Sequence, residues 1–354
     1  MIPAIAEPIL EPELPIVDPH HHLWFIKQAS QAAISSRTEI GAEAMAKLHR
    51  RIGRYLLDEL LGDATSGHNI RATVYVEAHA MYRPSGRPEL KSVGEIEFAN
   101  GVAAMAASGL FGHVKACAGI VGSVDFRLGD GVAEILEKHL RAGGDRYRGA
   151  RAVATLHDPD LPFFGGVANL LRDADFRAGF SHLQPLDLSF DACLFEPQLP
   201  DLIDLARAFP DTQIILNHLG NLIGIGPYAG RQSERFAIWR DNIRELSKCP
   251  NVTIKLGGLG GPFANLPSSA SPRPFSSVEL ADEWRPYIET CIESFGANRA
   301  MFESNFPIDS AATTYSTLWN AFKRIASGAS TEEKTALFSG TAARLYRLDR
   351  ANPA

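Results

Sequence analysis

Three consecutive histidines stand near the start of the chain, in the segment IVDPHHHLWF that covers residues 16–25. Apolar residues flank them, so the segment reads as a short buried strand whose end carries imidazoles. Side chains alternate along a strand, which places His20 and His22 on one face, about 7 Å apart, and His21 on the other. Histidine is the commonest metal ligand, so this pair suits one divalent ion once a third ligand arrives. The alternative is a hydrogen-bonded histidine cluster at a strand end.

The composition excludes several classes of protein. The chain has 354 residues, of which 45% are hydrophobic and 21% charged, as in a globular protein whose core needs no disulfides. A net charge of -6 and the lack of any basic run argue against a nucleic-acid partner. We also find no leader pattern, no run of about 18 apolar residues and no C-x-x-C pair. We therefore expect a cytoplasmic protein with reduced cysteines and no contact with membranes.

Prolines and helical spacing divide the first part of the chain. Pro3, Pro8, Pro12 and Pro15 predict an extended surface arm over residues 1–15, because proline fits neither a helix interior nor a central strand. Residues 16–350 then form one domain. The long segment from residue 27 to 69 carries apolar residues at helical spacing and predicts a helical insertion after the first strand, in the position of a lid.

Short apolar strands alternate with amphipathic helices along the rest of the chain. After residues 16–25, the expected strands are 72–79, 114–121, 149–156, 188–195, 213–218, 252–256 and 300–305. The expected helices are 93–108, 132–141, 168–180, 199–209, 234–248, 277–295, 313–327 and 331–338. Eight such units close most economically as an α/β (β/α)8 TIM barrel of parallel strands.

Polar side chains end most of these strands, and reacting residues of such barrels lie at the C-terminal strand ends. They are His20 and His22; Tyr75, Glu77 and His79, on one face by alternation; Glu196; Asn217 and His218; Lys255; and Glu303 and Asn305. Each alone has a structural explanation, such as an ion pair or a loop contact. Together they converge on one rim, which indicates a functional centre.

The motifs DPHHHLW, YVEAH, NHLGN, KLGG and MFESNFP, in this order, resemble the amidohydrolase superfamily. The closer resemblance is to TIM-barrel hydrolases that include pyrone-dicarboxylate lactonase and sugar-acid lactonases, and it spans nearly the whole chain after residue 15. It implies a zinc or manganese site formed by His20, His22, His218 and Glu196, where Glu196 replaces the usual strand-5 histidine. The same branch includes members that work without a metal, so the resemblance leaves the cofactor open.

The chain departs from the family pattern at Asn305, where the superfamily commonly has an aspartate that handles the proton of water. A neutral amide cannot accept a proton. We therefore expect Glu303 or Glu77 to act as the base, with Asn305 and His79 completing the catalytic group.

The leading hypothesis is hydrolysis of a small lactone that bears a carboxylate. Arg83, Arg151, Lys255 and Asn217 are the candidates to bind it, and arginine offers the better planar fork for a carboxylate. Two alternatives are a decarboxylase or other lyase of the same superfamily, which Asn305 permits, and a barrel that only binds a ligand. Apolar helix faces leave a homo-oligomer open.

The loop over residues 257–274 follows a strand at the rim and is expected to help set specificity. Its glycines, among them Gly257 and Gly258, fit either a close approach of the backbone to the site or a plain turn.

Overall fold

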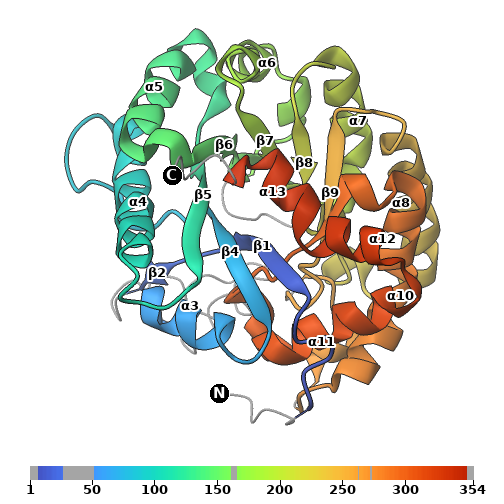
Figure 1. The fold of residues 1–354 in the computed structure, drawn as a ribbon. Helices are drawn as coiled ribbons and strands as arrows, with labels where there is room; N and C mark the ends of the chain where they lie inside the picture. The colour runs from blue at the N-terminus through green and yellow to red at the C-terminus, as the bar shows by residue number, and fades with distance from the viewer. Residues whose placement is uncertain (1–6, 27–51, 161–165, 262, 272, 349–354) are drawn as a thin grey trace.

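The computed structural model describes residues 7–26, 52–160, 166–261, 263–271 and 273–348. Eight parallel strands form one sheet in the order β1-β4-β5-β6-β7-β8-β9-β10. Their bounds are β1 Pro15–His21, β4 Asn69–Val76, β5 Lys115–Ser123, β6 Tyr147–Arg151, β7 Ser189–Ala192, β8 Ile214–Leu216, β9 Val252–Leu256 and β10 Ala300–Phe302. Residues just past β10 bond to β1: Asn305 N–H donates to the His20 carbonyl (2.9 Å) and His22 N–H to the Phe306 carbonyl (2.8 Å). These bonds close the sheet, so the predicted (β/α)8 barrel is confirmed (Figure 1).

Helices surround the strands, as Figure 1 shows. Their bounds are α3 Leu57–Ala64, α4 Val93–Ala107, α5 Val132–Gly143, α6 Ala174–Phe180, α7 Leu199–Ala208, α8 Gln232–Leu246, α9 Pro267–Ala270, α10 Ser277–Phe295, α11 Tyr315–Ile325, α12 Thr331–Thr335 and α13 Thr341–Leu345. The longest, α10, begins with a capping box in which Ser276 and Glu279 bond each other's backbone N–H. None of the helices described is long and apolar enough to cross a membrane.

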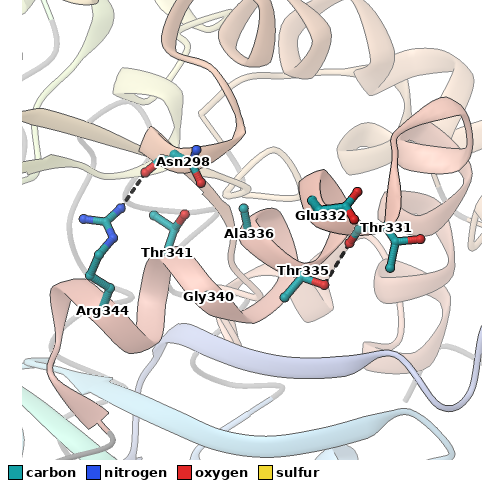
Figure 2. A pocket seen from close by; sticks show the side chains of 8 residues that line it. All are labelled: Asn298, Thr331, Glu332, Thr335, Ala336, Gly340, Thr341 and Arg344. Atoms are coloured by element: carbon teal, nitrogen blue, oxygen red, sulfur yellow. Dashed lines mark hydrogen bonds between the residues drawn. The ribbon is translucent and has the colours of Figure 1, made fainter.

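The apolar core has two main parts. The larger fills the space between strands and helices, and a smaller one fills the barrel interior with inner residues such as Val17, Val74 and Met301. Ala342 of α13 and Tyr346 just beyond it belong to the interior part. The C-terminal segment therefore closes the N-terminal end of the barrel, opposite the strand ends that carry the polar residues. The sequence did not predict this helix, whose residues Thr341 and Arg344 line a shallow surface hollow with Asn298 and α12 (Figure 2).

Most of the predicted strands extend too far at their C-terminal ends. The second strand ends at Val76 rather than His79, and the fourth at Arg151 rather than Leu156. The polar side chains there bond one another, while the backbone N–H of Glu77 still donates to the Val121 carbonyl at 2.9 Å. One consequence corrects a predicted orientation: Tyr75 points outward to Glu95 of α4, whereas Glu77 turns inward to Arg151. The common face of Tyr75, Glu77 and His79 is wrong, because alternation stops where the strand stops.

The N-terminal arm and the insertion are described in part. Residues 7–14 contain neither helix nor strand, and Lys323 of α11 donates to the carbonyls of Leu10 (2.8 Å) and Glu11 (2.9 Å). Residues 27–51 of the expected lid lie outside the described residues. The rest of the insertion forms β3 (Arg54–Tyr55), which pairs with β2 (Trp24–Phe25), and the predicted helical segment before residue 69 appears as α3.

Candidate active site

His20 and His22 share one face, as the alternation predicts. Their Nε2 atoms lie 3.3 Å apart, while His21 points away and its Nε2 lies 2.8 Å from the Thr73 hydroxyl. Nδ1 of His22 lies 2.8 Å from the Val76 carbonyl oxygen, which can only accept a hydrogen bond. The proton of His22 is therefore on Nδ1, and its Nε2 keeps a lone pair directed at His20.

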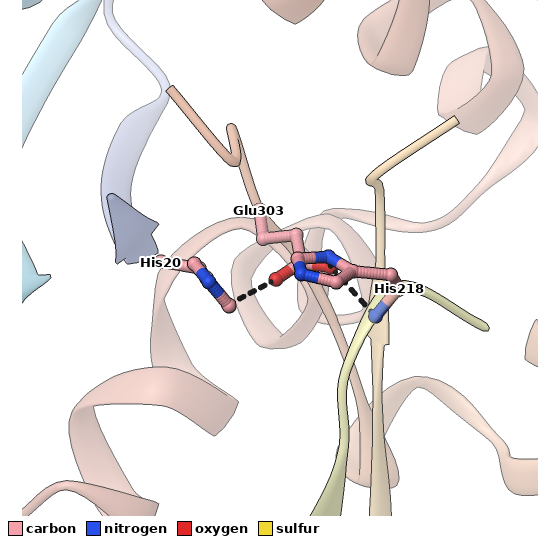
Figure 3. Close-up of side chains that lie close together, drawn as sticks. All are labelled: His20, His218 and Glu303. Carbon is pink, nitrogen blue, oxygen red and sulfur yellow. Dashed lines mark hydrogen bonds and ion pairs between the residues drawn. The ribbon is translucent and has the colours of Figure 1, made fainter. Parts of the chain in front are cut away.

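Glu303 lies between His20 and His218, as Figure 3 shows. Its Oε2 is 2.8 Å from Nδ1 of His20, and its Oε1 is 2.8 Å from Nδ1 of His218. The backbone N–H of His218 also donates to Oε1, at 3.0 Å. A carboxylate accepts both hydrogen bonds from His218, which leaves Nε2 of that ring with its lone pair.

The imidazoles of the strand-1 pair are held neutral. Burial lowers the pKa of His20 well below its ordinary value, and the charge of Lys255 lowers it further. Burial and then the charge of Arg151 do the same to the pKa of His22. Near pH 7 both rings therefore have a lone pair for a proton or a metal ion.

The donor set fits a divalent metal. Ligand atoms of His20, His218 and Glu303 all lie within 4.8 Å of one another, and all three residues are buried. Glu303 Oε2 and Asn305 Oδ1 are buried acceptors that receive no hydrogen bond from the described residues. Imidazole nitrogens and carboxylate oxygens are the ligands that zinc takes in proteins, so this group could hold the predicted ion.

Glu196 does not join this group, and this corrects the predicted ligand set. It is buried, but Nε of Arg235 on α8 donates to its Oε1 at 2.7 Å, and Nη2 of the same arginine engages Oε2. The carboxylate is thus neutralised by a helix residue 39 positions further along the chain. Among the described residues, Glu303 is the carboxylate that lies with His20 and His218.

The backbone at the strand ends is strained. His79, His218 and Asn305 adopt φ values of 54°, 55° and 52°, a left-handed conformation that non-glycine residues rarely take. Such strain costs about 1–3 kcal/mol per residue and is typical of functional sites. Gly258 lies so close that a Cβ added to it would stand 2.5 Å from Cβ of His218. The glycine-rich loop therefore makes a close approach to the site rather than a plain turn.

Lys255 and Asn217, predicted to bind substrate, lie beneath the histidines. Nζ of Lys255 is 2.6 Å from Oδ1 of Asp191 on β7 and 3.2 Å from Nδ1 of His20. Nδ2 of Asn217 donates to the same Asp191 oxygen at 3.0 Å. All three are fully buried, and Asp191 engages both of the predicted substrate binders. Asp191 was missed, although one acid inside the apolar run SFDACLF could have signalled it.

Arg151 and Glu77 form a buried pair at the rim. Nε of Arg151 lies 2.6 Å from Glu77 Oε1, and its Nη2 donates to the Glu77 carbonyl at 2.6 Å. Burial, the largest single cause, would raise the pKa of Glu77, but the charges of Arg151 and His79 and the hydrogen bonds from both residues together lower it. His79, which is half exposed, lies 3.2 Å from the other Glu77 oxygen. The Glu77 carboxylate is thus already paired with Arg151, which makes Glu77 a weak candidate for the general base.

Arg83 lies apart from the other candidates. It is exposed and pairs with Glu97 of α4 through Nε, at 3.2 Å. The structure therefore does not bring it to the histidines, and a surface ion pair accounts for its position.

Asn305 has a partner that the sequence analysis missed. Its Nδ2 donates to Oδ1 of Asp309 at 2.8 Å, and Asp309 Oδ2 accepts from the Gly260 N–H at 3.1 Å. Asp309 thereby fixes which way the amide of Asn305 points and leaves its oxygen unpaired among the described residues. Burial raises the pKa of Asp309 to about 8. The signal was the acid four residues after Asn305 in MFESNFPID.

A barrel with imidazoles on strand 1 and beyond β8 defines an amidohydrolase, and the comparisons agree. The amidohydrolase family profile matches residues 17–348, so the chain belongs to this family and is an enzyme of amidohydrolase type. An uncharacterized protein of Sinorhizobium fredii, y4mH, is 33% identical over 95% of this chain and 99% of its own length.

Two further matches come from Burkholderia multivorans. One is an L-fucono-1,5-lactonase, 27% identical over 94% of this chain and 96% of its own length. The other is an amidohydrolase with a crystal structure that contains bound zinc; it is 26% identical, covers 94% of this chain and 99% of its own, and has a TM-score of 0.67. The predicted family is confirmed.

Proposed function

We propose that this enzyme hydrolyses the lactone ring of a sugar acid or a similar small hydroxy acid. The observation that carries the proposal is Glu303, a buried carboxylate whose Oε1 accepts hydrogen bonds from His218 and whose Oε2 lies 2.8 Å from Nδ1 of His20 with no other partner among the described residues. The similarity to an L-fucono-1,5-lactonase supports the same class of substrate.

Hydrolysis needs a base, an oriented water and stabilisation of an oxyanion. Nε2 of His22 and Nε2 of His218 have lone pairs that orient a water molecule, and Glu303 Oε2 takes its proton as the oxygen attacks the carbonyl carbon. The C–O bond of the ring then breaks, and the proton returns from Glu303 to the departing alkoxide. The products are one hydroxy acid, with all atoms of lactone and water accounted for.

Positive charge near the histidines favours the developing oxyanion. The guanidinium of Arg151 is close enough to lower the pKa of both His20 and His22. We assign Arg151 to oxyanion or carboxylate stabilisation and the half-exposed His79 to substrate contact at the rim. A divalent ion held by His20, His218 and Glu303 would add Lewis-acid polarisation of the carbonyl. The relative with bound zinc makes zinc the first ion to test.

The test measures metal content by elemental analysis and lactone hydrolysis before and after chelation. The substrates are 1,5- and 1,4-lactones of sugar acids, L-fucono-1,5-lactone among them, followed with a pH indicator. We expect hydrolysis of at least one lactone that Glu303→Gln abolishes. Restoration by added zinc after chelation would assign the ion, and turnover that resists chelation would show that the side chains act without a metal.

A lyase reaction is the second candidate, because Asn305 replaces the carboxylate on which family hydrolysis commonly relies. Aromatic and unsaturated acids are therefore added to the same panel with detection of CO2. Release of CO2 without hydrolysis of any lactone would overturn the proposal. Turnover of neither class would favour a barrel that only binds its ligand.

A further inference from the structure

A line of polar contacts crosses the barrel interior from the C-terminal segment to His20. The hydroxyl of Tyr346, just after α13, lies 3.0 Å and 3.3 Å from the two carboxylate oxygens of Asp191. Asp191 pairs with Lys255 at 2.6 Å, and Lys255 in turn lies 3.2 Å from Nδ1 of His20. Only two side chains thus separate Tyr346 from a histidine of the site.

The surroundings make these contacts strong. Tyr346, Asp191, Lys255 and His20 are all fully buried, and the barrel interior around Tyr346 is apolar. Electrostatic interactions weaken little over such distances where water is absent. Nε of Arg148 on β6 donates to the Tyr346 carbonyl at 2.7 Å and fixes the segment in the barrel.

Lys255 contacts one carboxylate directly, that of Asp191, and is linked to a second through His20. Nδ1 of His20, which it contacts, is also 2.8 Å from Oε2 of Glu303. Asp191 Oδ1 accepts hydrogen bonds from Tyr346 and, at 3.0 Å, from Asn217, which hold that carboxylate in one orientation. The ring of Tyr346 lies 5.5 Å from Nζ and closes the space beneath it. Lys255 is thereby kept on Asp191.

We propose that Tyr346 is a positioning residue of the active site, which acts on His20 through Asp191 and Lys255. The C-terminal segment is then a working part of the site and not only a plug of the barrel. This inference rests on the proposed lactone-hydrolysing site.

The test compares Tyr346→Phe with Tyr147→Phe in the full-length protein. Tyr147 is a matched control, because it is also buried and its hydroxyl bonds Nδ1 of His139, at 3.0 Å, away from the site. In metal-free protein labelled with 15N-histidine, long-range 1H–15N NMR spectra report the state of each ring. We expect Tyr346→Phe to move the His20 signals, identified by their loss in His20→Gln, and to leave those of His139. Tyr147→Phe should do the reverse.

Kinetics provide the second readout. Tyr346→Phe should lower kcat about tenfold, with KM changed less than about twofold, because His20 is displaced while the substrate contacts remain. Leu348→Ala loosens the same buried segment without removing the hydroxyl and should spare the His20 signals. Asn217→Ala, which removes another donor to Asp191, should move them and serves if Tyr346→Phe folds poorly.

Unmoved His20 signals in both Tyr346→Phe and Asn217→Ala would overturn the inference, as would equal shifts in Leu348→Ala. If the wild-type enzyme hydrolyses no lactone, the proposed function fails, whereas the NMR comparison still decides the role of Tyr346.

Discussion

Two buried carboxylates, Glu77 and Glu303, stand at the same end of the barrel with opposite surroundings. Glu77 faces a guanidinium: Arg151 binds its side chain at 2.6 Å and its carbonyl at 2.6 Å. Glu303 faces imidazoles at 2.8 Å on either side, and its Oε2 has no partner other than His20 among the residues described. The first charge is compensated within the fold. The second is left able to act on a substrate.

The contrast shows that the partners of a buried carboxylate decide whether it stabilises the fold or takes part in catalysis. A buried ion pair that is complete holds its two elements in place, here the ends of β4 and β6, and removal of one partner is costly. The side-chain partners of the Glu303 carboxylate are imidazoles, and it can still accept a proton. Stability and activity should therefore respond separately to changes at the two positions.

The largest expected effect is on turnover. Glu303→Gln keeps the shape of the side chain but removes the proton acceptor, so kcat/KM should fall by about 10²–10⁴-fold. The free energy of unfolding, measured by urea denaturation, should change by about 1 kcal/mol or less, because the amide oxygen of the new side chain still accepts the hydrogen bonds from His218. Retention of activity by this variant would transfer the role of base to another residue.

Glu77→Gln should show the reverse pattern. It leaves the buried guanidinium of Arg151 without a counter-charge, which is expected to cost about 3 kcal/mol of stability. The folded fraction should keep turnover within about tenfold of the wild type, since Arg151 remains. The comparison breaks if Glu77→Gln is as stable as the wild type but inactive, because Glu77 would then be the base.

The two carboxylates also show which features of the site could be predicted from the sequence. Glu303, His20, His22 and His218 were found because strand periodicity and the barrel rule place strand ends at one rim. The partner of each residue was not predictable in this way. Glu196 meets Arg235, and Arg83 meets Glu97, because helices packed outside the barrel bring those side chains near, and no periodicity encodes that packing.

The direction of the side chains just past the strand ends was the second feature that the sequence could not predict. Alternation fails where a strand ends early, as it does after Val76. Contacts from the opposite end of the barrel were equally out of reach, because Tyr346 reaches Asp191 only after α13 has closed the interior. The sequence therefore predicts which residues gather at the site better than it predicts what each of them contacts.

The next prediction concerns the departure from the family at strand 8. Asn305→Asp would restore the usual carboxylate but place it beside Asp309, at the present 2.8 Å contact. The pKa of Asp309 is raised to about 8, so the two acids would share a proton near pH 7. The new carboxylate is then not free to act as a base, and the variant should lose activity about tenfold. The exchange Asn305→Asp with Asp309→Asn keeps one donor and one acceptor between the two positions, and should recover most of that loss. Steady-state kinetics of the single and double variants measure the coupling.

The same exchange bears on Glu303. If the carboxylate introduced by Asn305→Asp serves as a base in the double variant, Glu303→Gln should cost less activity in that background than in the wild type. An equal cost in both backgrounds would show that Glu303 remains the base wherever the second carboxylate stands.

The smallest expected effect is on the pH dependence of stability. It comes from a second buried acid near Glu77, namely Glu95. Oε1 of Glu95 accepts hydrogen bonds from the Tyr75 hydroxyl and from the backbone N–H of Ala78 and Ala80, at 2.8–2.9 Å. Burial, and then the charge of Glu77, raises the pKa of Glu95 from 4.5 to about 8. The folded protein thus keeps a proton that the unfolded chain releases.

Stability must therefore fall as pH rises through that interval, because the folded state binds the extra proton. The slope for one proton is at most about 1.4 kcal/mol per pH unit. Glu95→Gln removes this contribution, so the wild type should lose stability relative to the variant as pH rises from about 5 to 8. The difference between the two urea-unfolding curves cancels contributions of the same sign from Asp309 and Asp18, whose pKa values are also raised. A difference that stays constant with pH would mean that Glu95 is ionised, and that Arg151 compensates two carboxylates rather than one.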